Sequence, residues 1–146
     1  MRKISKEELS EILNTHKIWL YSSHKLGSRA DLSITKLSGA SLYGGNLSGA
    51  NLSGAYLYRA NLSGAILSGA ILSGAEGITL FRYEKHLAVA FDNNKYIAIG
   101  CKQYRTGNWV KNFEKIGKDE DYSNSQLKMY GQFINMINET LKEKIL

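Results

Sequence analysis

Leucine recurs at every fifth position through the middle of this 146-residue chain. A helix repeats every 3.6 residues and a strand every two, so neither element can place these leucines on one buried face. If each pentapeptide forms one side of a four-sided turn, about twenty residues complete a coil and every leucine points inward. The period therefore predicts a solenoid. The column comprises Leu32, Leu37, Leu42, Leu47, Leu52, Leu57, Leu62, Leu67 and Leu72.

Two further columns follow the same period. A small residue stands two positions before nearly every central leucine, with Thr35 as the exception, and glycine stands two positions after most of them. Glycine accepts the positive φ that a corner turn requires. Ile34 and Arg59 replace that glycine, so we expect their corners to use another turn type. The glycine column comprises Gly39, Gly44, Gly49, Gly54, Gly64, Gly69 and Gly74.

The repeated motif is similar to that of a known family. Residues 30–34 read Ala-Asp-Leu-Ser-Ile, and residues 50–54 and 60–64 both read Ala-Asn-Leu-Ser-Gly. These segments resemble the pentapeptide-repeat family, whose pattern is Ala-(Asp/Asn)-Leu-X-X. The resemblance implies a mainly β protein built on a short right-handed quadrilateral β-helix, which would occupy residues 30–76. The segment His16–Leu20, a glycine-containing loop and the following Ala-Asp-Leu-Ser also resemble small bacteriophage-encoded members, which implies a phage origin.

A solenoid of little more than two coils, spaced at about 4.8 Å, would expose its core at both ends unless other segments covered them. Residues 1–29 provide an N-terminal capping helix and linker. Ser5 and Glu8 form a capping box, and we expect a helix over residues 5–21. Its apolar face comprises Leu9, Ile12, Leu13, His16, Trp19 and Leu20.

Residues 77–146 change to a period of two, which predicts a β-meander followed by helices. A short helix around residues 109–116 ends at Gly117, and a longer one begins at the Ser123-x-x-Gln126 box. We expect its apolar stripe to pack on the meander or on a second subunit. The predicted strands are 78–83, 87–91 and 96–100, separated by turns at 84–86 and 92–94. The stripe comprises Leu127, Tyr130, Ile134, Ile137, Leu141 and Ile145.

Charge and cysteine content limit the setting of the protein. Lys and Arg total 19 against 13 Asp and Glu, and the excess lies in the terminal segments because residues 30–76 carry two of each sign. A net charge of +6 favours anionic partners, although it also serves plain solubility. The single cysteine, the lack of a signal peptide and the lack of a long apolar run indicate a cytoplasmic protein without a membrane partner. If the chain is phage-encoded, that cytoplasm is the host's.

The segment Cys101–Trp109 combines cationic and aromatic side chains beyond a predicted strand. Lys102 and Arg105 could neutralise phosphates on one electropositive surface, while Tyr104 or Trp109 stacks on a base. In the alternative interpretation Trp109 is a core residue and the cations are only solvated. The sequence leaves both open. A tail with Ile-Gly-Cys and a downstream Trp also occurs in the phage proteins that the chain resembles, which favours a module.

The sequence favours a protein that is not an enzyme. The three histidines and Cys101 have no metal-ligand spacing, and the glycines follow the repeat and precede no phosphate-loop lysine. We therefore expect no catalytic residue, metal or cofactor. The best-known members of the family imitate DNA with a long acidic solenoid and engage DNA gyrase. The solenoid here is short and neutral, so DNA mimicry is not expected.

These observations predict a non-enzymatic binding protein of phage type. Its basic terminal modules would sequester an anionic host ligand, such as a nucleotide signal, or engage a host protein, in a setting of host-defence evasion. The alternative is a structural or assembly protein that acts by homo-oligomerisation without a small ligand. Ile66 and Ile71 interrupt an otherwise polar outer column, so we expect either the C-terminal segment or a second copy to cover them.

Overall fold

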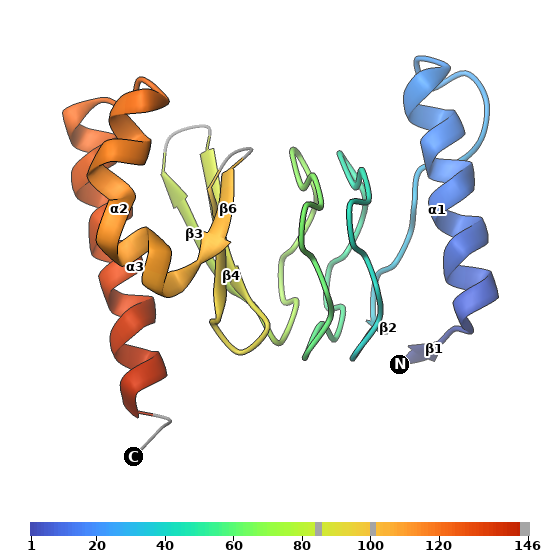
Figure 1. Ribbon diagram of the computed structural model, residues 1–146. Helices are drawn as coiled ribbons and strands as arrows, with labels where there is room; N and C mark the ends of the chain where they lie inside the picture. Colours follow the sequence, from blue (N-terminus) through green and yellow to red (C-terminus); the bar gives the residue numbers. More distant parts are fainter. Residues whose placement is uncertain (84–85, 100–101, 144–146) are drawn as a thin grey trace. The chain divides into compact units, whose positions relative to one another are not determined.

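A computed structural model describes residues 1–83, 86–99 and 102–143, which divide into two compact units (Figure 1). The repeat unit is Met1–Gly77, and the sheet–helix unit is Ile78–Leu146. The N-terminal cap and the solenoid, predicted as separate segments, belong to one unit. None of the helices in the described ranges is long and apolar enough to cross a membrane. The predictions for Cys101, for Ile145 and for most of the turn at 84–86 lie outside the described residues.

Parallel bridges stack the coils of the repeat unit. Asp31 pairs with Asn51 and Asn51 pairs with Ile71, so residues twenty positions apart lie side by side. The Leu32 amide donates to the Asn51 carbonyl at 2.8 Å, and the Leu52 amide repeats this bond to Ile71 at 2.8 Å. The predicted twenty-residue spacing is confirmed. The extended segments are short, and within residues 30–76 only β2 (Thr35–Lys36) forms a strand.

The leucine column forms the core of the repeat unit. Leu52 is fully buried between Leu32 and Leu72, as its position in the coil predicts. The other leucines of the column are also buried, except Leu67, which is half-buried. Ala55 and Ala60 of the small-residue column are fully buried as well. Small side chains leave room for the leucines at the narrow centre, which explains why both columns follow one period.

The corners keep one conformation throughout. Glycines of the corner column have φ between 63° and 71°. Ile34 and Arg59 have φ of 50° and 58°, so they adopt the same left-handed conformation despite their side chains. The expectation of another turn type at these corners was wrong. Backbone bonds between coils continue through both positions, and the Ile34 amide donates to the Ser53 carbonyl at 2.8 Å. These bonds hold a conformation that costs a non-glycine residue about 1–2 kcal/mol.

A hydrogen-bonded pair repeats along the outside of the coils. The Asp31 carboxylate accepts from the Ser33 amide at 3.1 Å and from its hydroxyl at 2.7 Å. Asn51 makes the same two bonds to Ser53, and its amide donates to Asp31 at 3.3 Å. The two bonds from Ser33 lower the pKa of Asp31 below its ordinary value. Asx turns of this kind explain why Asp or Asn precedes several leucines and Ser follows them.

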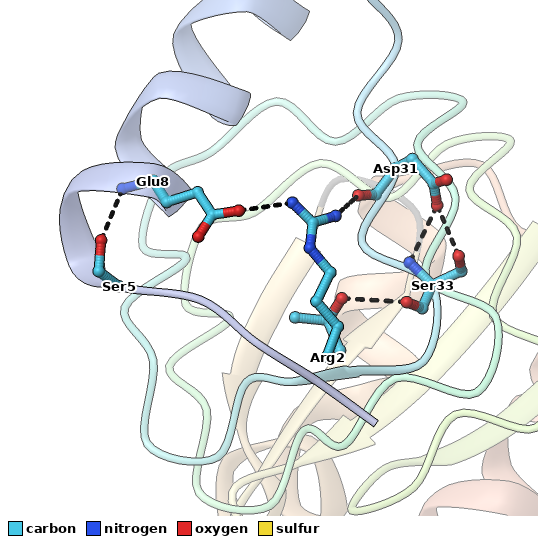
Figure 2. A network of polar contacts seen from close by, with 6 residues as sticks. Arg2, Ser5, Glu8, Asp31 and Ser33 are labelled. Atoms are coloured by element: carbon cyan, nitrogen blue, oxygen red, sulfur yellow. Dashed lines mark hydrogen bonds and ion pairs between the residues drawn. The ribbon is translucent and has the colours of Figure 1, made fainter.

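Helix α1 (Lys6–Tyr21) begins at Ser5, whose hydroxyl accepts from the Glu8 amide at 3.0 Å. Strand β1 (Arg2–Lys3) runs parallel to β2. Figure 2 shows Arg2 joining the helix to the first coil: its guanidinium pairs with Glu8 at 2.7 Å and donates to the Asp31 carbonyl at 3.3 Å. The predicted capping helix is therefore attached to the start of the repeats by strand pairing and by side chains.

The sheet–helix unit contains a four-stranded antiparallel meander in the order β3-β4-β5-β6. The first three strands lie where the sequence predicted them. The fourth was missed, because Lys-Gln-Tyr-Arg carries no alternating apolar pattern. The strands are β3 (Thr79–Tyr83), β4 (His86–Phe91), β5 (Tyr96–Ile99) and β6 (Lys102–Arg105).

Two helices, α2 (Thr106–Asp119) and α3 (Asn124–Glu143), pack on one face of this sheet (Figure 1). Helix α2 begins three residues before the predicted start. The predicted capping box is confirmed, because the Ser123 hydroxyl accepts from the Gln126 amide at 3.2 Å and the Gln126 side chain accepts from the Ser123 amide at 2.8 Å. The stripe on α3 packs on the meander, one of the two expected covers. The shared core comprises Ala88, Ala90, Ile97, Ile99, Trp109, Tyr130, Phe133, Ile134 and Ile137.

Candidate anion-binding site

The aromatic residues proposed from the sequence belong to the core of the sheet–helix unit. Trp109 is fully buried, and its indole N–H donates to the Ile97 carbonyl at 2.7 Å. Tyr104 is partly buried and meets the Trp109 ring edge-on, with 5.3 Å between ring centroids. This arrangement matches the alternative interpretation, in which Trp109 is structural. The buried Trp109 ring therefore has no free face for stacking on a base.

The two cations of that segment are separated. Lys102 and Arg105 occupy β6 at positions of opposite parity, so their side chains leave opposite faces of the sheet. Lys102 forms an ion pair with Glu120 at 2.9 Å, beyond the C-terminal end of α2. Arg105 lies at the other end of that helix, as its N-cap residue. The expectation of a single electropositive surface shared by Lys102 and Arg105 was therefore wrong.

Arg105 instead lines a cavity of about 870 Å³ at the start of α2. Its walls come from the β4–β5 turn, the β6–α2 junction and the C-terminal part of α3. Three of the lining side chains are cationic and none carries a carboxylate. The lining residues are Asn93, Lys95, Arg105, Thr106, Gly107, Asn108, Lys111 and Leu141.

Backbone hydrogen bonds fix the turn that carries Lys95. Asp92, Asn93 and Asn94 adopt positive φ of 50°, 54° and 66°, a conformation that Asp and Asn tolerate better than most residues. The Thr106 amide donates to the Lys95 carbonyl at 2.9 Å, and the Thr106 hydroxyl donates to the Asn94 carbonyl at 2.6 Å. The β4–β5 turn is thereby tied to the first residue of α2, and Lys95 is brought to the same cavity as Arg105.

Aromatic stacking orients Arg105. Its guanidinium carbon lies 5.5 Å from the centroid of the Tyr96 ring, within the range of a cation–π interaction. Tyr96 in turn stacks on the buried Phe91, with 5.6 Å between centroids. An arginine held in this way loses less side-chain entropy when it binds an anion.

The first turn of α2 adds a positive electrostatic potential. No side chain caps this helix, and its first turn contains no acidic residue. A β-carbon added at Gly107 would meet nothing within 4 Å, so the backbone there is open to an approaching group. The N–H groups at a helix start and the helix dipole favour an anion. Together with three cationic side chains, they give this cavity the chemistry of an anion-binding site.

Two smaller hollows have mixed charge. One, of about 640 Å³, borders α2 and includes Glu114 and Asp119 beside its lysines. The other, of about 330 Å³, lies in the repeat unit and includes Glu8, Glu11 and Asp31 beside two arginines. Carboxylates repel an anionic ligand, so the cavity at the start of α2 is the best match to anion binding among these three.

Sequence reasoning identified Arg105 and missed Lys95 and Lys111. The omission has a physical cause, because Lys95 is ten residues before Arg105 and reaches it only through the pairing of β5 with β6. Lys111 lies one helical turn beyond Gly107 and faces the same cavity. One signal was present in the sequence: the segment Thr106–Asn108 opens a helix with glycine and without an acidic residue.

The twenty-residue stacking and the buried leucine column define the first unit as a repeat protein. Residues 35–74 match the family model of pentapeptide repeats, with eight copies. This segment therefore consists of pentapeptide repeats, as the sequence predicted. A comparison with curated proteins found no match to the chain. The family match ends before the sheet–helix unit and therefore carries no information about the cavity there.

Proposed function

We propose that this chain is a non-enzymatic binding protein that takes an anionic ligand into the cavity at the start of α2. The observation that carries the proposal is the lining itself, in which Lys95, Arg105 and Lys111 converge without a carboxylate. The helix start adds backbone N–H groups that suit a phosphate or carboxylate. A volume of about 870 Å³ exceeds the needs of a single inorganic ion and accommodates a ligand of nucleotide size.

The repeats would serve as scaffold in this proposal. We infer that the stacked coils form the right-handed quadrilateral β-helix typical of the family. Their two basic and two acidic residues leave the coil neutral, so DNA mimicry has no electrostatic basis. A phage-type protein that sequesters a host nucleotide signal would bind it through the sheet–helix unit, and the repeats would carry that unit.

The test is calorimetric titration of the full chain with inorganic phosphate, mononucleotides and cyclic dinucleotides. We expect at least one nucleotide to bind and the double variant Arg105→Glu/Lys111→Glu to abolish that binding. The matched control is Lys115→Glu/Lys118→Glu, which makes the same charge change on the same helix outside this cavity. Equal loss of binding in both variants would show that net charge alone causes the effect. Binding that survives in Arg105→Glu/Lys111→Glu would refute the site.

A second proposed function is assembly by homo-oligomerisation. Ile66 and Ile71 are 50% and 42% exposed, so the repeats leave much of their side-chain surface uncovered. Cover by a second copy is one of the two versions expected from the sequence. Light scattering after size exclusion would test it: we expect a multiple of 16.3 kDa for the natural chain and a smaller mass for Ile66→Asn/Ile71→Asn. A single species near 16.3 kDa for the natural chain would reject assembly.

A further inference from the structure

One histidine of the repeat unit occupies a position that only its neutral form fits. His16 lies on α1, and its side chain is completely buried. Its Nδ1 atom accepts a hydrogen bond from the backbone amide of Ala30 at 3.0 Å. A ring nitrogen can accept only when it carries no proton, so the neutral ring must hold its proton on Nε2. This bond joins the capping helix to the first residue of the first repeat.

The surroundings of His16 oppose a positive charge. Trp19 of the same helix stacks on one side of the ring, with 5.4 Å between centroids. From the linker, Arg29 places a positive charge near the ring, and His24 stacks on Trp19 with 3.8 Å between ring centroids. The first coil contributes the Ala30 amide and the backbone of Ser48, which are uncharged.

Burial is the largest influence on the titration of His16, and it lowers the pKa of the ring below its ordinary value. The Arg29 charge acts in the same direction, whereas the nearby backbone of Ser48 acts in the opposite one. Because the folded-state pKa is lowered, the neutral ring contributes stability that is fully present above the unfolded pKa of about 6.5. That contribution decreases as the pH falls below this value.

We propose that His16 is an acid-sensitive latch that holds helix α1 on the first coil and releases it when the ring is protonated. Protonation puts a second N–H on the ring, at Nδ1, where it faces the Ala30 N–H. The hydrogen bond at 3.0 Å then becomes a contact between two donors. It also leaves a charge buried beside Arg29. Release of the helix removes the contact between the two donors and the buried charge, because the protonated ring then reaches water.

Other contacts make this release a local change. The β1–β2 pairing and the Arg2–Glu8 ion pair hold the start of α1 at the first coil, while His16 and Trp19 hold its second half. Trp19 covers Gly49 of the coil, where an added β-carbon would lie 3.8 Å from the indole. Acid release would therefore begin at the C-terminal half of α1 and uncover the coil there.

The test is a nuclear magnetic resonance titration of the full chain from pH 7.5 to 5. We expect His16 to carry its proton on Nε2 at pH 7.5. Below the unfolded pKa of about 6.5, amide protection of α1 should fall by up to about tenfold per pH unit relative to α3, because release takes up one proton. His16→Asn supplies a non-titrating acceptor near the Nδ1 position, so it should keep the bond to Ala30 and abolish the pH response.

The control is His24→Asn, which removes the neighbouring ring at a position with φ of 68° that asparagine tolerates. This variant should retain the response. A proton on Nδ1 at pH 7.5, or titration of His16 without loss of α1 protection, would overturn the proposal. A response that persists in His16→Asn, or that disappears in His24→Asn, would also overturn it. If His16→Asn does not fold, the tautomer and titration of the natural chain still decide the question.

Discussion

The repeat unit uses one five-residue pattern at each side of its coil, whereas the sheet–helix unit builds its core from four strands and two helices without a common pattern. In the first unit a leucine has the same environment every twenty residues, and the contacts that bury it come from the next coil. In the second, Trp109 is buried by residues that share no period with it. Buried residues can therefore be predicted from the sequence where the pattern repeats. Where no pattern repeats, the tertiary fold determines which residues are buried.

The largest expected effect is loss of the repeat unit alone. Leu52→Asp places a charge without a partner in the fully buried column. The cost is several kcal/mol against a typical total of about 5–15 kcal/mol, so the coil should unfold. Circular dichroism and hydrogen exchange would follow both units separately. Ser38→Asp, at an exposed position of the coil, is the control and should leave stability nearly unchanged. A folded repeat unit in Leu52→Asp would contradict the burial of this column.

The corresponding change in the other unit is Trp109→Ala. It removes the largest buried side chain and the hydrogen bond to Ile97, at a cost of about 3–5 kcal/mol. Trp109→Phe keeps most of the ring and should lose about 1–3 kcal/mol, because it removes the buried hydrogen bond to the Ile97 carbonyl. Chemical denaturation measures both values. We expect α1 and the coils to keep their amide protection in both variants, and equal loss in the two units would show that they unfold together.

A smaller effect concerns the corners. Arg59→Gly removes a side chain from a position with φ of 58°, so it should raise the free energy of unfolding by up to about 1 kcal/mol. The reverse change at an equivalent corner, Gly64→Ala, should lower it by a similar amount. Thermal denaturation would show whether each variant raises or lowers the stability of the repeat unit. Destabilisation by Arg59→Gly would mean that contacts of the arginine outweigh the strain of its backbone.

The outer column allows a further test of repetition. Ile71 occupies the position at which Asn51 bonds to Ser53 in the coil beside it. Ile71→Asn should form the same turn with Ser73 and stabilise the repeat unit by about 0.5–1.5 kcal/mol. Ile71→Ala is the control, because it removes the exposed apolar side chain without adding an acceptor. Equal melting temperatures for the two variants would argue against a new hydrogen bond.

The smallest effect is a pH dependence at Asp31. Hydrogen bonds from Ser33 lower its pKa below the ordinary value of 3.8. The resulting stability is present above the unfolded pKa and is lost as the pH falls through the lower folded pKa. Asp31→Asn keeps an acceptor for Ser33 and should remove this part of the acid dependence. Denaturation at pH 5 and below pH 3 would compare the variant with the natural chain, and identical acid dependence would contradict the prediction.

The sequence by itself determined the repeat unit. The leucine, small-residue and glycine columns share one period, so a single geometry satisfies all of them, and the capping boxes at Ser5 and Ser123 are local signals. Ile34 and Arg59 show the limit of this reasoning. Their corners keep a positive φ because neighbouring coils impose it, which residue preference alone did not predict.

Only the tertiary structure decided the candidate site. The pattern of residues 101–109 pointed to a joint role for Lys102 and Arg105, yet the alternation of strand β6 separates them. Pairing of β5 with β6 and the start of α2 instead bring Lys95 and Lys111 to Arg105. Cations that are far apart in the chain carry no local periodic signal. Their convergence depends on strand pairing and on the direction of each side chain, and both are settled only when the sheet and helices pack.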